Sequence, residues 1–114
     1  MHELGVVFYI LDSVKKIAIE NKAKGIRMVI LEIGDVSGII PYYLEDCWQW
    51  AIKKDEMTKD AELKIETIKA VSYCSDCKKE FDTIKNGKTC PVCKGGNTYL
   101  LTGNEVNIKE IEVF

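Results

Sequence analysis

The chain has 114 residues, and its 16 basic and 18 acidic side chains give a formal net charge of −2 at pH 7. With 46% hydrophobic and 30% charged residues, it has the composition of a soluble globular protein, which at this length buries roughly two thirds of its unfolded surface. The first apolar run, Leu4 to Leu11, is followed by Asp12 and is far shorter than the ~20 residues that span a bilayer, which excludes a membrane span there. We therefore expect a cytoplasmic protein with no membrane partner.

The first predicted element is an amphipathic helix that begins near Leu4. Its apolar residues recur every three or four positions, as they do along one face of a helix: Leu4, Val7, Leu11, Val14 and Ala18. Gly25 is expected to end this helix, because glycine adopts the left-handed backbone conformation of a C-cap without steric cost.

A buried strand and a second helix are predicted next. Residues 26 to 33 are rich in branched apolar side chains and are too few for a surface helix, which indicates a buried strand. The second helix begins near Pro41, since proline suits a first helical position. Its apolar stripe has five members: Leu44, Cys47, Trp48, Ala51 and Ile52. We expect Cys47 to pack as a small hydrophobic side chain and not to react.

Two further strands are predicted towards the C-terminus. Residues 62 to 68 begin with an alternation of polar and apolar side chains, which indicates a half-exposed strand. In the last strand, Ile108 and Ile111 are out of phase by one residue. This shift predicts a β-bulge near Lys109 and Glu110.

These elements predict an α+β fold in which two helices pack on a small mixed three-stranded sheet. Before the last strand lies a polar, turn-rich segment that contains four of the five cysteines, with Asn86 and Gly87 as a β-hairpin turn signal. We expect this segment to be an inserted zinc-ribbon-like module. The predicted domains are an α/β domain of residues 1–70 plus 101–114 and a zinc-binding domain of residues 71–100.

The four cysteines of this segment are spaced as C-x2-C-x12-C-x2-C: Cys74, Cys77, Cys90 and Cys93. Each pair can reach one ion from a single tight turn, and two such turns complete a tetrahedron, so the spacing predicts a zinc site. Four thiolates leave no open position for water, which indicates a structural and not a catalytic zinc. Reduced thiolates also favour the cytoplasm over an oxidising compartment.

Other uses of the cysteines remain open from the sequence. Two disulfides, or rubredoxin-type iron, could use the same residues. A thiol oxidoreductase could use the two pairs, because such pairs can have depressed thiol pKa values. A zinc ribbon could also be an adaptor that binds only protein partners. Nucleic-acid binding is not expected, because Val71 to Leu100 has five lysines against three acidic residues, and a zinc tetrathiolate would cancel that excess.

A second candidate metal site surrounds His2, the only histidine. A free α-amine on Met1, the amide nitrogen between residues 1 and 2, and the His2 imidazole can close a five-membered and a six-membered chelate ring. Three nitrogen donors in one plane suit Ni(II) or Cu(II). The alternative is a frayed terminus, with Glu3 favouring the positive end of the helix. One histidine at the chain end offers no catalytic constellation, so we expect no enzyme activity.

Met1, His2 and Glu3, joined to a four-cysteine module of this spacing, resemble the HypA/HybF family of hydrogenase nickel-incorporation proteins. Three further segments agree with the family pattern in order and distance: residues 32–38, 61–65 and 108–113. The resemblance implies a nickel metallochaperone that binds Ni(II) at Met1, His2 and Glu3 and structural Zn²⁺ at the four cysteines. It further implies delivery of nickel for maturation of a [NiFe] hydrogenase, with residues 1–70 plus 101–114 as the nickel-binding domain.

The resemblance also implies partners. These are a nucleotide-hydrolysing nickel chaperone, either a HypB-type GTPase or an ATPase, and the hydrogenase large subunit. Some members carry a histidine in the zinc loop, whereas this chain has none, so a fourth nickel ligand would be the Glu3 amide, water or a group on a partner. The chain could be a monomer or a homodimer, since an inserted hairpin can exchange between chains.

Overall fold

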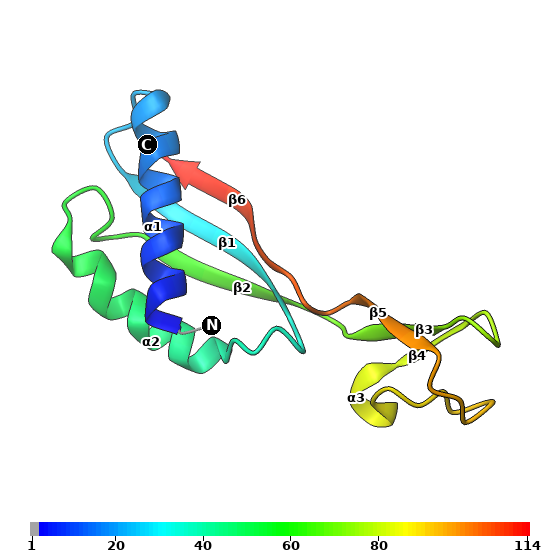
Figure 1. The fold of residues 1–114 in the computed structure, drawn as a ribbon. Coiled ribbons are helices and arrows are strands. Elements are labelled where there is room, and N and C mark those ends of the chain that lie inside the picture. The colour runs from blue at the N-terminus through cyan, green and yellow to red at the C-terminus, as the bar shows by residue number, and fades with distance from the viewer. Residues whose placement is uncertain (1–2) are drawn as a thin grey trace.

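The central sheet of the protein has three strands in the order β2-β1-β6, and helices α1 and α2 cover one of its faces (Figure 1). The structure is a computed structural model that describes residues 3–114. Strand β1 (Ile26–Gly34) pairs in parallel with β2 (Glu62–Ile68) and antiparallel with β6 (Val106–Val113). The sheet is therefore mixed, and the predicted α+β fold is confirmed.

Helix α1 (Glu3–Glu20) ends well before Gly25, so the predicted C-cap was wrong. The helix is closed at Lys22, whose backbone is left-handed with φ of 57°. The N–H groups of Lys22 and Ala23 donate to helix carbonyls at 3.0 and 2.9 Å, which is the hydrogen-bond pattern of a Schellman C-cap. A Cβ at Gly25 would instead lie 2.5 Å from the tip of the Phe114 ring, so a side chain there would displace that ring.

Helix α2 (Pro41–Ala51) begins at the predicted proline and continues into one 3₁₀ turn, η1 (Ile52–Lys54). Trp48 of this helix is fully buried, and its indole N–H donates to the Ala61 carbonyl at 3.0 Å. The apolar ring is therefore removed from water, and its N–H has a hydrogen-bond partner. Replacing such a ring with alanine costs roughly 3–5 kcal/mol. Cys47 lies half-buried against the same core, which agrees with the predicted packing role.

Strand β6 contains the predicted bulge. Ile30 pairs with Glu110 and the next residue of β1, Leu31, pairs with Ile108, so Lys109 is the extra residue. Because side chains alternate along a strand, one extra residue returns the apolar side chains beyond it to the core face. The change of phase between Ile108 and Ile111 in the sequence therefore arises from a β-bulge, as predicted.

A second sheet, in the order β4-β3-β5, contains the cysteine segment. It consists of three antiparallel strands: β3 (Val71–Cys74), β4 (Lys79–Asp82) and β5 (Thr98–Thr102). A short helix, α3 (Thr83–Asn86), follows β4. The predicted hairpin turn at Asn86 and Gly87 was wrong, because Gly87 ends α3 and its N–H donates to the Thr83 carbonyl at 2.7 Å.

The two sheets lie end to end, and the molecule is elongated (Figure 1). Its radius of gyration is 17.7 Å, whereas a compact domain of this length has about 13 Å. Elements of the first sheet stop at Ile68 and resume at Val106. The division into two domains, with boundaries at residues 70 and 100, stays a prediction. Between residues 3 and 114, none of the helices is both long and apolar enough to cross a membrane.

Candidate metal centres

The four cysteines of the second sheet converge on one point. Their Sγ atoms all lie within 4.8 Å of one another: Cys74, Cys77, Cys90 and Cys93. The sulfurs of Cys74 and Cys93 are 3.7 Å apart, and those of Cys77 and Cys90 are 3.9 Å apart. A tetrahedron of sulfurs with metal bonds of ~2.3 Å has edges of about 3.8 Å. The cluster thus fits one tetrahedral ion, and its separations are nearly twice the ~2.04 Å of a disulfide.

Each cysteine pair lies in a tight turn, and the two turns are closed in the same way. The Lys78 N–H donates to the Cys74 carbonyl at 2.7 Å, and the Lys94 N–H donates to the Cys90 carbonyl at 2.9 Å. Both lysines are left-handed, with φ of 58° and 62°. This backbone reverses the chain directly after the second cysteine of each pair. Sequence analysis did not single out these lysines, although a lysine after each C-x2-C pair was a visible signal.

Backbone N–H groups and one aromatic ring support the sulfurs. The Cys77 N–H donates to the Cys74 sulfur at 3.4 Å, and a glycine N–H of the second turn donates to the Cys93 sulfur at 3.4 Å. Such donors favour the charged form of a thiol. Phe81 of β4 packs against the buried Cys74 and Cys90, while Cys93 is exposed. One side of the cluster is therefore dry and the other faces solvent.

Two thiols of the cluster have shifted pKa values, in opposite directions. The N–H groups of Cys93 and Val92 lower the pKa of the Cys90 thiol to about 7, although burial opposes them. Hydrogen bonding to Cys93, together with burial, raises the pKa of the Cys77 thiol to about 12. Protons therefore remain until a divalent cation supplies the compensating charge. With four sulfurs at tetrahedral spacing and no open position, the cluster is suited to structural Zn²⁺, as predicted.

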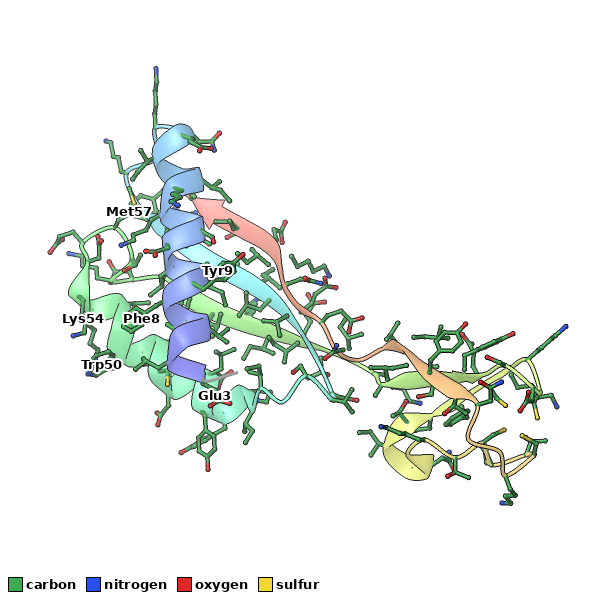
Figure 2. The ribbon with its side chains drawn as sticks, in the orientation of Figure 1. Glu3, Phe8, Tyr9, Trp50, Lys54 and Met57 are labelled. Carbon is green, nitrogen blue, oxygen red and sulfur yellow. The ribbon has the colours of Figure 1, made fainter. Side chains whose placement is uncertain are left out.

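The predicted nickel site lies at the start of α1. Met1 and His2 are outside the described residues, whereas Glu3 is the first residue of the helix, where its negative charge favours the helix dipole. The Glu3 Oε2 accepts a hydrogen bond from the Ile40 N–H at 3.3 Å. Sequence analysis missed this contact, because the two residues are 37 positions apart. Glu3 lies at the helical end of the molecule, away from the cysteines of the second sheet (Figure 2).

Exposed aromatic side chains lie on the helices near this end. Phe8 and Trp50 meet edge to face with ring centroids 6.3 Å apart, and the Lys54 ammonium lies 3.9 Å from the Trp50 ring centroid (Figure 2). Tyr42 and Tyr43 contact each other at the start of α2. Tyrosine, tryptophan and phenylalanine are enriched in protein interfaces. This end of the molecule is therefore suited to contact a partner.

Comparison with known proteins decides the family. A family model described as hydrogenase/urease nickel incorporation, metallochaperone, HypA, matches residues 1–113. The chain belongs to this family. The hydrogenase maturation factor HypA of Geotalea uraniireducens is 38% identical over 114 residues, which cover 99% of each chain. That of Aquifex aeolicus is 33% identical over 113 residues, which cover 99% of this chain and 97% of the relative.

Solved HypA structures share the fold. The solution structure of the Ni metallochaperone HypA from Helicobacter pylori has a TM-score of 0.73 and 26% identity, and the match covers 99% of this chain and 97% of that one. Another solution structure of a HypA protein has a TM-score of 0.74 and 27% identity, with 100% and 97% covered. The prediction of a nickel-incorporation metallochaperone is therefore confirmed. The adaptor and thiol oxidoreductase alternatives are not favoured, because the family is described as one of metallochaperones.

Proposed function

We propose that Met1, His2 and Glu3 hold Ni(II) through nitrogen donors and that this chain delivers the ion for maturation of a [NiFe] hydrogenase. The family match over residues 1–113 is the observation that supports nickel as the transferred ion. The names of the relatives, hydrogenase maturation factors, support a hydrogenase as the recipient. The α-amine, the first amide nitrogen and the His2 imidazole supply three donors in one plane, which suits Ni(II).

The environment of Glu3 supports nitrogen ligation over carboxylate ligation. Its Oε2 is engaged by the Ile40 N–H. Its own N–H belongs to the first turn of α1, where backbone N–H groups have no partner within the helix. The fourth position would then be filled by the Glu3 amide, by water or by a group on a partner. Transfer would proceed by ligand exchange, in which His2 stays bound while an incoming ligand displaces the weakest donor.

The cysteine cluster would hold zinc as a fixed structural ion. We assign its four ligands to the converging sulfurs: Cys74, Cys77, Cys90 and Cys93. Because this set is complete, an incoming group finds no free position on the ion. The zinc would stabilise the second sheet, and nickel would be exchanged at the other end of the molecule.

The partners proposed for this chain follow from transfer of nickel. They are a nucleotide-hydrolysing nickel chaperone, of the HypB-type GTPase class or an ATPase, and a hydrogenase large subunit. We propose that the chain acts in the cytoplasm as a monomer or homodimer, without nucleic acid or membrane. The exposed aromatic side chains near Glu3 support docking of a partner at the nickel end.

The test is nickel binding by protein with its native terminus, measured by calorimetry. His2→Ala is expected to weaken nickel binding by at least about 100-fold, since loss of even an outer-shell partner of a metal ligand costs roughly 10- to 100-fold. Extending the chain before Met1 removes the free amine and should have a similar effect. Zinc content is the internal control, because both changes leave the cysteines intact. An unchanged nickel affinity in His2→Ala would refute the site, while normal hydrogenase maturation in cells carrying that variant would refute the delivery role.

A further inference from the structure

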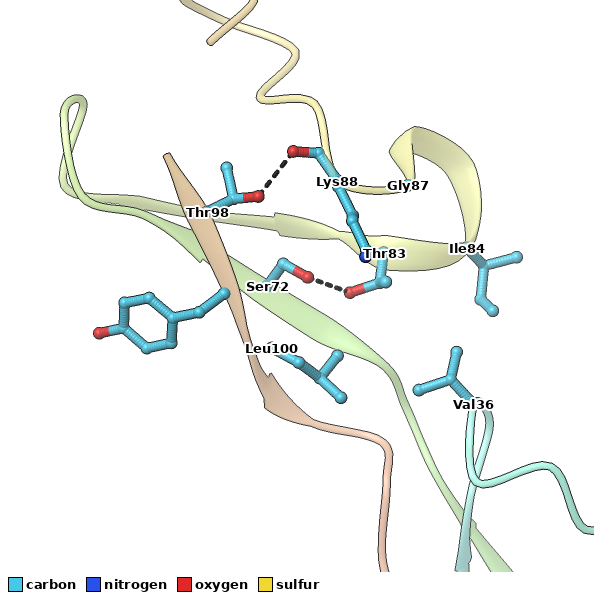
Figure 3. Close-up of a pocket in the computed structure, with 9 residues that line it drawn as sticks. Val36, Ser72, Thr83, Ile84, Gly87, Lys88, Thr98 and Leu100 are labelled. Carbon is cyan, nitrogen blue, oxygen red and sulfur yellow. Dashed lines mark hydrogen bonds between the residues drawn. The ribbon is translucent and has the colours of Figure 1, made fainter. Parts of the chain in front are cut away.

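A groove of about 560 Å³ lies where the second sheet meets the loop after β1 (Figure 3). Its walls come from β3, α3, β5 and the loop that contains Val36. Among residues 3–114, those that line the groove include no cysteine and no residue of the first turn of α1. The groove is therefore separate from both metal sites. Its volume is within the ~300–1,000 Å³ typical of ligand pockets.

Large apolar side chains that are not buried line this groove. Val36 is 38% exposed, Ile84 is 62% exposed and Leu100 is 37% exposed, and they approach one another from three separate segments (Figure 3). Tyr99, on the same strand as Leu100, is 54% exposed. Single exposed apolar residues are ordinary, whereas a contiguous group in a concavity marks a binding surface. The groove thus offers an apolar seat for a side chain.

The polar side chains that line the groove are one lysine and four hydroxyl-bearing residues. Lys88 is its only charged lining residue, and within residues 3–114 it forms no ion pair. The carboxylate of Asp82, the N-cap residue of α3, accepts from two backbone N–H groups at the helix start and pairs with Lys69. Ser72 and Thr83 share one hydrogen bond of 2.6 Å between their hydroxyls, which leaves one O–H free to donate. An ammonium and a free hydroxyl beside an apolar wall complement a carboxylate next to an apolar side chain.

The backbone at the junction of the two sheets holds this groove open in a defined shape. The Val36 N–H donates to the Gly103 carbonyl at 2.8 Å. Gly103 has φ of 111°, and a Cβ on it would lie 2.5 Å from the Ala70 Cα, so the backbones of the two connections are in direct contact. The loop that supplies Val36 is thereby fixed to the end of β5. A pre-formed groove binds without the cost of ordering its own walls.

We propose that this groove is a docking site for a partner protein and receives an apolar side chain that is flanked by carboxylates. Charge complementarity carries the choice of occupant, because Lys88 is the one charged residue that lines the groove in the described part of the chain. The occupant would contact the second sheet and the Val36 loop together, so its binding would hold the two ends of the metallochaperone in one relative orientation. The site does not depend on the proposed nickel ligands.

The test is an NMR titration of the zinc-loaded full chain with capped pentapeptides. The first probe has leucine between two glutamates, the second replaces the glutamates by lysines, and the third replaces the leucine by serine. The first peptide is expected to shift amide signals of residues 83–88 and 98–100 and to saturate in the low millimolar range. The second and third peptides are each expected to bind at least about fivefold more weakly. The second loses one exposed ion pair, and the third loses one buried apolar side chain.

Variants on the protein side complete the test. Lys88→Glu and Ile84→Ser should each weaken the first peptide several-fold. Lys16→Glu on α1 is the charge control, and Ile19→Ser is the apolar control, since Ile19 is 64% exposed and so matches the exposure of Ile84. Both controls should leave binding unchanged. The proposal would be overturned if the first peptide gave no saturable shifts up to about 20 mM, which is 10-fold above the dissociation constant expected for a weak contact through one side chain. Equal binding of the lysine peptide would also overturn it.

Discussion

The Glu3 carboxylate accepts a hydrogen bond from the Ile40 N–H at 3.3 Å, which ties the first turn of α1 to the start of α2. Ile40 is the N-cap residue of α2, and its own side chain makes no capping hydrogen bond. Glu3, the last of the three residues that we assign to nickel, therefore joins α1 to the start of α2. Glu3 has a structural role that can be separated from metal binding by mutation.

Replacement of Glu3 should affect stability more than nickel affinity. Glu3→Ala is expected to lower the free energy of unfolding by about 0.5–1 kcal/mol, because the hydrogen bond and the favourable charge at the helix N-terminus are both lost. Glu3→Gln keeps an acceptor for Ile40 and should lose only the charge. Urea denaturation measures the first effect, and calorimetry with Ni(II) should show affinities within about threefold of the parent, well below the change for a lost ligand.

The two Glu3 variants also discriminate between ligand sets. If the carboxylate were a nickel ligand, both variants would lose at least about tenfold in nickel affinity, since neither an amide nor a methyl group replaces a charged oxygen donor. Such a result would contradict ligation through nitrogen atoms at Glu3. A stability loss in Glu3→Ala alone, with nickel affinity retained, is the outcome that supports the assignment.

Nickel affinity should fall on acidification. The imidazole of His2 and the α-amine must lose protons before they bind, and their reference pKa values are ~6.5 and ~7.7–8.0. From about pH 8 to about pH 6, protons therefore compete first for the amine and then for the ring. Calorimetric titrations across this range should show a decline of more than about tenfold, in line with loss of two donors. A flat profile would argue against both ligands.

Zinc affinity should also rise with pH, because the cysteines must lose protons to bind the ion. In the metal-free cluster the pKa of Cys77 is raised to about 12 and that of Cys90 is lowered to about 7. At neutral pH the Cys77 thiol is protonated, so zinc must displace at least this proton, and the affinity should increase at least about tenfold per pH unit above pH 7. Below pH 7 the slope should become steeper, because Cys90 also binds a proton. Competition with a chelator of known pH dependence measures this slope, and a slope near zero would contradict thiolate ligation.

Removal of zinc should unfold the second sheet and spare the first. The apolar residues around the cysteines form a cluster separate from the core beneath α1 and α2. The small cluster is too limited to stabilise three short strands without the ion. In an NMR spectrum of chelator-treated protein, amide dispersion should be lost for residues 71–102 and retained for α1, α2 and β1. Complete unfolding would show instead that the two sheets form one cooperative unit.

The elements of the first sheet could be predicted because hydrophobic periodicity reports directly on burial. The alternation around Ile108 and Ile111 even located the bulge at Lys109, since one inserted residue inverts every later side chain. The zinc site could be predicted because its spacing follows from the geometry of one ion. In each case a local pattern has one dominant physical cause.

Other features depend on tertiary placement or on small energies. The predicted end of α1 was wrong because Lys22 adopts a left-handed backbone and closes the helix earlier. This conformation costs only about 1 kcal/mol, and two capping hydrogen bonds and the packing of the helix outweigh that cost. The contact between Glu3 and Ile40 and the groove at Val36 join residues distant in sequence. No local pattern encodes such pairs.

Lys22→Gly should stabilise the protein. Glycine relieves the left-handed strain at the C-cap, and this gain exceeds the added entropy of the unfolded chain, so an increase of about 0.5–1 kcal/mol is expected. Lys24→Gly is the matched control, because no positive φ occurs at that residue, and it should be neutral or destabilising. Thermal and urea denaturation of the two variants give the comparison. A destabilised Lys22→Gly protein would mean that the lysine side chain itself contributes to the cap.

Gly103→Ala should disrupt the junction between the two sheets. A Cβ at this residue would lie 2.5 Å from the Ala70 Cα, and φ of 111° is strained for any residue with a Cβ. The loss of stability is expected to be roughly 2–4 kcal/mol, as for other substitutions that combine a backbone clash with strain. Gly96→Ala is the control, because nothing lies within 4 Å of its Cβ position, and it should cost less than about 0.5 kcal/mol. If Gly103→Ala and Gly96→Ala unfolded at the same denaturant concentration, the segments that contain Ala70 and Gly103 would have moved apart at no cost to make room for the added Cβ. The contact between Gly103 and Ala70 could then not fix the Val36 loop against β5.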